Sequence, residues 1–179
     1  MSEAGAADAV WVAAQTQGGG GLLARIDTGT NQVGRKVLLR HAPTGLTVTP
    51  DARTVWVATG SDRVLHRVDA SAGRVTGQVK LPLVPHQVAF GDGAVWATAT
   101  RDDTVLRVNA ASHAITPIRV GNGPIGIAFG AERVWVANGQ DGTVSSIDPQ
   151  SNLVGTWHLG FRPSSVAVEQ RAVWVALAA

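Results

Sequence analysis

Short apolar runs separated by turn residues occur along the whole chain, and one of these runs recurs with little change. It reads Val-Trp followed by two small or β-branched residues, and it occurs at 10–13, 55–58, 95–98, 134–137 and 173–176. The tryptophans of these runs are 45, 40, 39 and 39 residues apart. Self-similarity at a fixed period of this length is typical of repeat architectures. We therefore interpret the chain as a repeat protein.

Each repeat predicts four short β-strands. In the third repeat the predicted strands are 87–90, 94–98, 104–108 and 114–120. These segments are rich in β-branched residues and are bounded by Gly, Asp, Asn or Pro, at an even spacing that predicts an antiparallel meander. Gly91-Asp92-Gly93 and Asp141-Gly142 supply residues that tolerate the positive φ of tight turns.

Four antiparallel strands in a unit of about 40 residues are typical of the blade of a β-propeller. The strands are apolar on both faces, which is expected when sheets stack face to face and bury both sides. We expect the repeated tryptophans to fill the space between neighbouring sheets as structural core, in preference to a role as ligand-stacking platforms. The predicted fold class is all-β: a β-propeller of about four four-stranded antiparallel blades, either partial or completed by oligomerisation.

The sequence predicts one repeat domain over residues 9–179, preceded by a disordered or vestigial segment at 1–8. Glu3–Ala7 stands where the first repeat should have its innermost strand, but it is small and polar, so seventeen strands are expected. The predicted units are roughly 9–41, 42–83, 84–122, 123–161 and a partial 162–179. Three interpretations remain open: a fragment of a larger propeller, association of copies, or closure in which 165–168 supplies the missing strand. We favour the first two.

Composition narrows the function classes. The 179 residues are 45% apolar and 16% charged, as expected of a globular chain. No apolar stretch approaches the roughly 18 residues of a membrane helix, and the N-terminal residues lack the features of a secretory signal. We expect a soluble chain without a membrane span, in a compartment that the sequence leaves open. Cysteine is absent and the net charge is only +2, with scattered arginines, so disulfides and nucleic-acid binding are not expected.

Residues 123–160 read GPIGIAFGAERVWVANGQDGTVSSIDPQSNLVGTWHLG. This unit resembles the YVTN-type, or YncE-like, β-propeller repeat of bacteria, and the resemblance covers residues 9–176. It implies a closed disc with more blades than this chain contains. It also implies a ligand- or protein-binding or sensor module, often exported to the periplasm or the cell exterior. The chain departs from that pattern in size, which is why a fragment or an oligomer is expected.

A more distant resemblance is to the streptogramin (virginiamycin B) lyase family, whose propellers use Mg²⁺ with His and Glu residues near the axis. The positions that match the family's Glu hold Ala14, Thr59, Ala99, Asn138 and Leu177. None of these is acidic, so we predict no catalytic residue, no metal site and no cofactor. The quinoprotein docking pattern is also missing, so pyrroloquinoline quinone is not expected. A lyase acting on a cyclic depsipeptide is the alternative function.

A proline opens the innermost strand of each later repeat, and the residue after it is predicted to line the mouth of the central channel. These residues are Thr44, His86, Ile125 and Ser164, flanked by Arg40, His41 and Arg162. The rim is mildly basic, so we expect a small anionic ligand or an acidic protein partner. His86 could act as a general base or a metal ligand, but it has no carboxylate at matching positions. The leading hypothesis is a non-catalytic binding or scaffold module.

Overall fold

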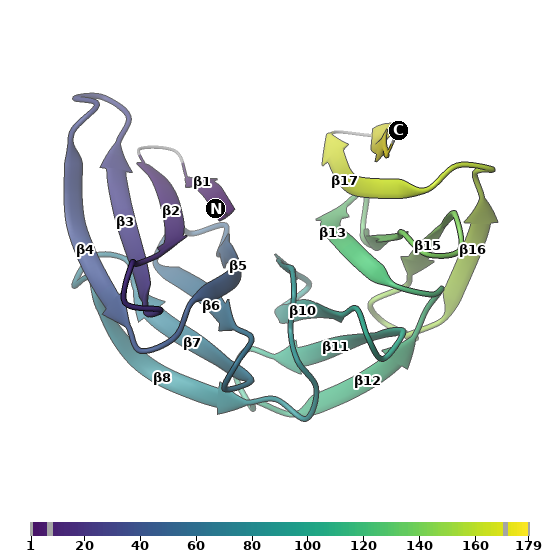
Figure 1. Ribbon diagram of the computed structural model, residues 1–179, viewed down its shortest axis with the longest axis horizontal. Helices are drawn as coiled ribbons and strands as arrows, with labels where there is room; N and C mark the ends of the chain where they lie inside the picture. The colour runs from purple at the N-terminus through teal and green to yellow at the C-terminus, as the bar shows by residue number, and fades with distance from the viewer. Residues whose placement is uncertain (1, 7–8, 170–171, 179) are drawn as a thin grey trace. The chain divides into compact units, whose positions relative to one another are not determined.

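The computed structural model describes residues 2–6, 9–169 and 172–178 (Figure 1). The strands are β1 Ser2–Ala6, β2 Ala9–Gln15, β3 Gly21–Asp27, β4 Val33–Leu39, β5 Pro43–Val48, β6 Thr54–Thr59, β7 Val64–Asp69, β8 Arg74–Lys80, β9 Val88–Gly91, β10 Ala94–Ala99, β11 Thr104–Asn109, β12 Ile115–Arg119, β13 Pro124–Gly130, β14 Arg133–Asn138, β15 Thr143–Ile147, β16 Val154–His158, β17 Pro163–Glu169 and β18 Ala172–Leu177. Within the described ranges, no helix is long and apolar enough to cross a membrane.

The strands form five antiparallel sheets, and each sheet follows chain order. We call β1–β4, β5–β8, β9–β12 and β13–β16 the first to fourth sheets, and β17–β18 the fifth sheet. The chain also divides into two compact units, residues 1–85 and 86–179. The predicted all-β class, with about four four-stranded antiparallel sheets, is confirmed.

The turns between the first two strands of each sheet follow the predicted chemistry only in part. In the third sheet a two-residue turn joins β9 to β10, and Asp92 and Gly93 have φ of 52° and 67°. Residues that tolerate positive φ are favoured in such turns because they match the twist of the flanking strands. The equivalent turn of the fourth sheet has the same geometry, but it is built from Ala131 and Glu132, with φ of 48° and 58°.

The N-terminal segment differs from the prediction. Ser2–Ala6 forms β1, which pairs with β2 from Ser2↔Ala13 to Ala6↔Ala9, so the described residues hold eighteen strands. An added strand pairs through its backbone groups, so small residues suffice where the neighbouring strand offers unpaired N–H and C=O groups. Ala7 and Asp8 lie outside the described residues.

The closure by 165–168 considered from the sequence is also wrong. That segment belongs to β17, which pairs with β18. The edge of β2 that it would have occupied is taken by β1.

The hairpin between the third and fourth strands of each sheet is closed by one repeated side-chain interaction. Oδ1 of Asp27, Asp69, Asn109 or Asp148 accepts backbone N–H groups two and three residues ahead. These are Asx turns, in which a short side chain replaces a backbone acceptor. Hydrogen bonds to the charged form lower the pKa of a carboxyl group. The pKa values of Asp27, Asp69 and Asp148 are accordingly lowered. The main cause in each is one backbone N–H, which belongs to Thr30, Ala72 and Ser151 respectively.

Apolar side chains fill the space between consecutive sheets inside each unit. In the first unit Trp11 is buried in a cluster that includes Leu23 and Val37 of its own sheet and Val55 and Val57 of the second sheet. In the second unit Trp96 lies in the corresponding cluster between the third and fourth sheets. The prediction that these tryptophans are structural core holds for both.

The same prediction is wrong for Trp174, which is exposed on β18. The fifth sheet has two strands, and no further sheet among the described residues covers its tryptophan face. Trp135 is half-buried.

Candidate functional site

Three of the four residues that follow the opening prolines stand at a repeated irregularity in the sheets. The pairing of β5 with β6 shifts register between Pro43 and Gly45, so Thr44 is the extra residue of a β-bulge. The same register shift makes Ile125 the extra residue in β13 and Ser164 the extra residue in β17. Bulges re-aim a side chain and are frequent beside functional sites. We call Thr44, His86, Ile125 and Ser164 the strand-start residues.

Two of the strand-start residues use their hydroxyl groups in hydrogen bonds to backbone carbonyl oxygens of a neighbouring strand or turn. Thr44 Oγ1 lies 3.3 Å from the carbonyl oxygen of Ala58 and 3.1 Å from that of Pro85, and it is half-buried. Ser164 Oγ donates to the carbonyl oxygen of Ala176 at 3.2 Å. These hydrogen bonds hold the bulges in place, so both hydroxyls have a structural role.

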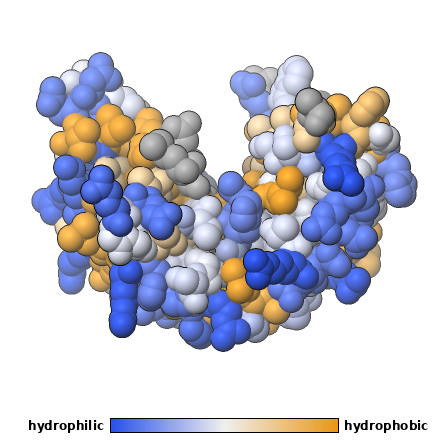
Figure 2. Space-filling view, in the orientation of Figure 1, coloured by the Kyte–Doolittle hydropathy of each residue, from blue (hydrophilic) through white to orange (hydrophobic). Residues whose placement is uncertain are grey.

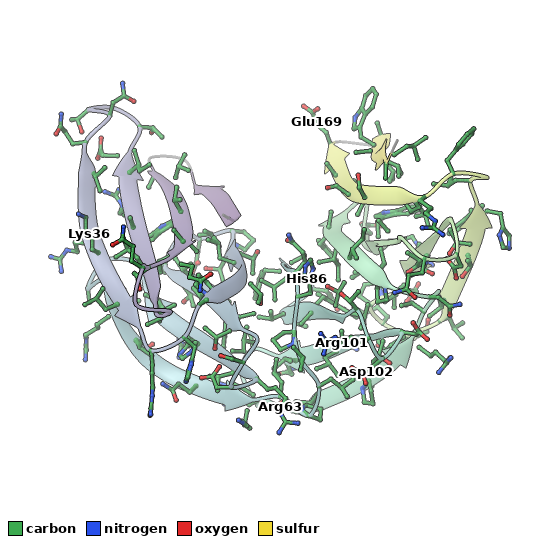
Figure 3. All side chains as sticks on the ribbon, in the orientation of Figure 1. Lys36, Arg63, His86, Arg101, Asp102 and Glu169 are labelled. Atoms are coloured by element: carbon green, nitrogen blue, oxygen red, sulfur yellow. The ribbon has the colours of Figure 1, made fainter. Side chains whose placement is uncertain are left out.

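His86 is exposed just before β9 (Figure 3). Its backbone N–H donates to the carbonyl oxygen of Thr98 at 2.8 Å, which extends the ladder of the third sheet. Its Nδ1 lies 3.3 Å from the carbonyl oxygen of Ile125, so the structure brings these two predicted residues together. The ring is therefore positioned by the fourth sheet while it faces solvent.

In the first unit Arg40 is exposed, and His41 belongs to a polar network at the end of the second sheet. His41 Nε2 lies 3.8 Å from Oδ2 of Asp62. Thr59 Oγ1 lies 2.6 Å from the other oxygen of this carboxylate and 3.1 Å from Nε2 of His66. One carboxylate and one hydroxyl therefore connect His41 to His66, which are 25 residues apart in the sequence.

His66 is buried, and its Nδ1 has no hydrogen-bond partner among the described residues. Burial lowers the pKa of His66, the nearby His41 lowers it further, and Asp62 opposes both effects. Protonation would put a second N–H on a buried ring that has only one partner, which is unfavourable. His66 is therefore neutral at pH 7 and acts as a structural group.

Arg162 lies at a hollow of about 290 Å³ in the second unit. The hollow is lined by Gln140, Asp141, Gly142, His158, Gly160, Phe161 and Arg162. Phe161 and Arg162 are both exposed, and they precede Pro163 of β17. Sequence reasoning selected Arg162 and missed Phe161. A large aromatic residue in a turn, where the third repeat has Asn122, is the signal that could have found it.

The carboxylate of Asp141 at this hollow is already engaged. Its Oδ1 accepts the hydroxyl of Thr143 at 2.6 Å, and its Oδ2 accepts the backbone N–H of Asn122 at 2.7 Å. Nearby, the buried Asn138 donates to the hydroxyls of Thr143 and Ser145, both at 2.9 Å. Asn138 stands at a position where the lyase-like propellers have Glu. In this chain that position supports the turn.

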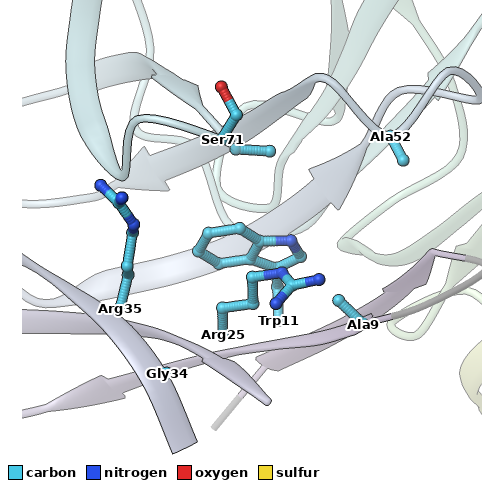
Figure 4. Close-up of a pocket in the computed structure, with 8 residues that line it drawn as sticks. Ala9, Trp11, Arg25, Gly34, Arg35, Ala52 and Ser71 are labelled. Carbon is cyan, nitrogen blue, oxygen red and sulfur yellow. The ribbon is translucent and has the colours of Figure 1, made fainter. Parts of the chain in front are cut away.

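The first unit has a second kind of hollow, of about 340 Å³ (Figure 4). It lies at the strand ends where the third and fourth strands of a sheet are joined, whereas the hollow at Arg162 lies where the second and third strands are joined. Trp11 lines this hollow together with Arg25, Arg35, Ser71 and the small residues Ala9, Gly34, Ala52 and Ala70. Arg25 pairs with Asp27 at 3.6 Å, and Arg35 Nη1 donates to the carbonyl oxygen of Ala72 at 2.8 Å.

A hollow of about 390 Å³ with acidic lining occurs at the corresponding strand ends of the second unit. Because such hollows recur between stacked sheets while their charge differs, we interpret them as packing gaps. Among the described residues no group of three or more His, Cys, Asp or Glu side chains could hold a metal ion.

The predicted site residues fall in both compact units. Arg40, His41 and Thr44 belong to the first unit, and His86, Ile125, Arg162 and Ser164 belong to the second. Within the units the structure joins Thr44 to Pro85 and His86 to Ile125. Arg162 instead lies at the hollow beside Phe161.

No protein-family model matches this sequence, and no curated protein matches it. Solved structures do match. The chain is similar to U3-55K with a TM-score of 0.85 at 13% identity, over 98% of this chain and 59% of that one. It is similar to the WD40 domain of Toxoplasma gondii coronin with a TM-score of 0.73 at 12% identity, over 87% and 44% of the two chains.

Hydrazine synthase of Kuenenia stuttgartiensis gives a TM-score of 0.73 at 16% identity, over 88% of this chain and 49% of that one. This chain therefore spans 59% or less of the length of these three structures. At such identities the likeness shows the fold alone. That fold is a β-propeller, with about four four-stranded blades in this chain.

Proposed function

We propose that this chain is a non-catalytic β-propeller module of the bacterial YVTN type, which binds an acidic protein segment or a small anionic ligand. The Val-Trp repeats support the type, and propellers serve widely as rigid scaffolds whose connecting loops carry the binding function. The larger size of the similar structures supports a bigger propeller, formed with further blades or further copies. An exported or sensor role is what the resemblance to the YVTN type implies.

The observation that carries the proposal is the hollow beside β17, where an exposed aromatic ring and an exposed guanidinium group stand together. Phe161 and Arg162 are adjacent there, and His158 lies on the same hollow. Aromatic residues and arginine are enriched in interface cores and dominate binding energy when a partner buries them. A partner that fills this hollow would bury both side chains.

The charge of the hollow favours an acidic ligand. Asp141 is its one carboxylate among the lining residues, and both of its oxygens accept hydrogen bonds from the protein. The Arg162 guanidinium can form a bidentate pair with a carboxylate or a phosphate. Phe161 adds apolar area beside that pair. We infer that the ligand presents an anionic group next to an apolar one.

The direct test uses a dye-labelled peptide of alternating Glu and Leu, with inorganic phosphate as the small-anion probe. Fluorescence anisotropy should show saturable binding of the peptide that weakens as salt is added, because exposed charges are screened. Arg162→Ala should weaken binding by at least about tenfold, and Phe161→Ala by less. Arg74→Ala removes the same charge from an exposed site on β8 and should leave the affinity unchanged.

Equal affinities for the parent chain, Arg162→Ala and His86→Ala would show that neither the hollow nor the strand-start residues bind the peptide. Competition by phosphate alone would assign the anionic group as the recognised element. If phosphate fails to compete while Phe161→Ala abolishes binding, the ligand is read by its apolar part, and the anionic assignment is wrong.

A further inference from the structure

The outer edges of the four four-stranded sheets are open to pairing with a further strand. Each sheet ends in an outer strand, which is β4, β8, β12 or β16, and no strand among the described residues pairs with its outer edge. The edge has the same place in all four sheets, including those that another four-stranded sheet follows in the chain. Unpaired N–H and C=O groups at such an edge attract other strands, and proteins protect their edges with bulges, prolines or charged side chains.

The outer strands of the first unit are protected by bulges and by cationic side chains. The pairing of β3 with β4 shifts register, and β4 carries Arg35 and Lys36. The pairing of β7 with β8 also shifts register, and β8 carries the exposed Arg74 and Lys80. Figure 2 shows hydrophilic residues gathered along the margin of the first unit where β8 lies. A bulge interrupts the regular row of backbone groups, and like charges repel a copy of the same strand.

The outer strand of the third sheet is protected by a proline. The N–H of Val120 donates to the carbonyl oxygen of Asp103, so Val120 directs its backbone groups toward the β11 side of the sheet. Successive residues of a strand direct their N–H and C=O groups to opposite edges. Pro117 and Arg119 therefore face the outer edge, where Pro117 offers no N–H and Arg119 adds a charge.

The outer strand of the fourth sheet, β16, lacks all of these protections. It pairs with β15 without a register shift, and its five residues include no proline and no Lys, Arg, Asp or Glu. It lies at the margin of the fourth sheet (Figure 1). The N–H of Leu159 donates to the carbonyl oxygen of Gly142, on the β15 side. By the same alternation Val154, Thr156 and His158 direct their backbone groups outward, and all three residues are exposed.

We propose that β16 pairs antiparallel with β16 of a second copy of this chain, so that the fourth sheets of two copies join edge to edge. A two-fold axis through Thr156 places it opposite the partner's Thr156. Val154 then lies opposite the partner's His158, and His158 lies opposite the partner's Val154. Every outward-facing residue of the strand thus has a counterpart with which it exchanges hydrogen bonds, as a symmetric dimer requires.

Charge identifies a second copy as the occupant of the edge. Like charges directly opposite each other destabilise a strand pair, whereas opposed threonines contribute favourably. A two-fold pairing of β8 would set Arg74 and Lys80 against the same cations of its copy. An acidic foreign segment would fit such a cationic edge better than it would fit β16. The uncharged β16 brings no like charges together, so its own copy is complementary to it.

The pairing is short, so the dimer should be weak and reversible. One strand edge buries less area than the roughly 1,200 Å² at which standard interfaces begin. We expect light scattering to show a rise from the monomer mass to twice that mass between about 1 µM and about 1 mM chain. The rise should stop at the dimer, because the pairing occupies this edge in both copies.

A proline variant tests the edge. Thr156→Pro removes the outward N–H at the centre of the pairing, in the way that Pro117 lacks one on β12. Thr156→Val is the matched control, since it loses the same hydroxyl and keeps the N–H. The dissociation constant of the dimer should rise at least about tenfold in the proline variant and stay unchanged in the valine variant. Circular dichroism checks that both variants are folded.

Charge variants test the two-fold symmetry and the identity of the partner. Thr156→Lys and Thr156→Glu each place two like charges opposite each other across the axis. Each variant alone should dimerise at least about tenfold more weakly, and an equimolar mixture should recover a dimer with one copy of each. Energy transfer between a donor dye on one variant and an acceptor dye on the other detects this mixed dimer. Added salt should reduce both effects, because the charges are exposed.

A parent chain that stays monomeric across the concentration series would overturn the proposal and leave an extended segment of a different protein as the occupant. A dimer that Thr156→Pro leaves unchanged would overturn it as well, and so would a mixture of the two charge variants that shows no recovery. Thr156 does not line the hollow at Arg162. The mass in solution therefore reports on the edge of β16, and the peptide of alternating Glu and Leu reports on the hollow.

Discussion

The third and fourth sheets have the same strand order and the same short first turn, yet they differ in how their tryptophan faces are covered. Trp96 is fully buried, its Nε1 donates to the carbonyl oxygen of Gly91 at 3.0 Å, and Arg107 lies over its ring at 5.3 Å. Trp135 makes the equivalent bond to Gly130 at 3.3 Å but remains half-buried. The burial of a repeated tryptophan therefore depends on the sheet that packs against it as well as on the sheet to which it belongs.

The largest expected effect comes from deleting the two tryptophans. Trp96→Ala should lower the free energy of unfolding by about 3–5 kcal/mol, because a buried ring is replaced by a cavity. Trp135→Ala should cost about 2 kcal/mol, since less area returns to water. Urea unfolding of both variants checks this. Equal losses would mean that the neighbouring sheet does not set the burial energy.

Substitutions in the first turn of the fourth sheet should have a smaller effect, and they should raise the free energy of unfolding. Ala131 and Glu132 hold positive φ, which costs an ordinary L-residue about 1–2 kcal/mol at each position. Replacing them with Asn and Gly, as in a favoured hairpin turn, should therefore raise the free energy of unfolding by about 1 kcal/mol.

The converse change, Gly93→Glu in the third sheet, should lower the free energy of unfolding by a similar amount. Thermal unfolding of both variants measures the pair. A loss of stability in the Asn-Gly variant would show that Ala131 and Glu132 make contacts that outweigh the backbone strain.

The smallest expected effect is a loss of stability at low pH that distinguishes the Asx hairpin of the fourth sheet, closed by Asp148, from that of the third sheet, closed by Asn109. The N–H groups of Ser151 and Gln150 and the Ser151 hydroxyl hold the pKa of Asp148 below 3.8, whereas the third sheet has Asn109 in this place. A lowered folded-state pKa means that the contribution of Asp148 is present above its unfolded value and is lost as the pH falls through the folded one. Asp148→Asn should reduce the acid loss of stability, and Asn109→Asp should increase it.

Melting temperatures measured at about pH 6 and about pH 2.5 test the acid effect. Little change is expected at the higher pH, because an Asn side chain closes the same turn in the third sheet. Identical acid losses for the parent chain and Asp148→Asn would show that other carboxylates dominate the response.

The strands were predictable because their signals are local. The spacing of Val-Trp runs and turn residues placed β9 to β12 within one or two residues of their observed bounds. The strand β1 was missed because its pairing depends on the free edge of β2 and not on large side chains of its own. The exposure of Trp174 was missed for a related reason, since its sequence matches that of the buried tryptophans.

The candidate site was predictable only at the level of position. The opening prolines in the sequence predicted the positions of Thr44, Ile125 and Ser164. The register shifts show that each of them is the extra residue of a β-bulge in its own sheet. The hydrogen bonds that engage Thr44 and Ser164 depend on neighbouring carbonyl groups, which a linear pattern does not place. The same holds for Thr59, whose hydroxyl joins Asp62 to the buried His66.

The Asx hairpins have a consequence for how this chain is made. Each sheet pairs only strands that are consecutive in sequence, and each outer hairpin is closed by a side chain within the turn itself. Contacts between near neighbours require little loop closure and form fast. A ribosome that delivers the chain from its N-terminus can therefore release one sheet after another ready to fold, and within each compact unit the finished sheet is the surface on which the next one assembles.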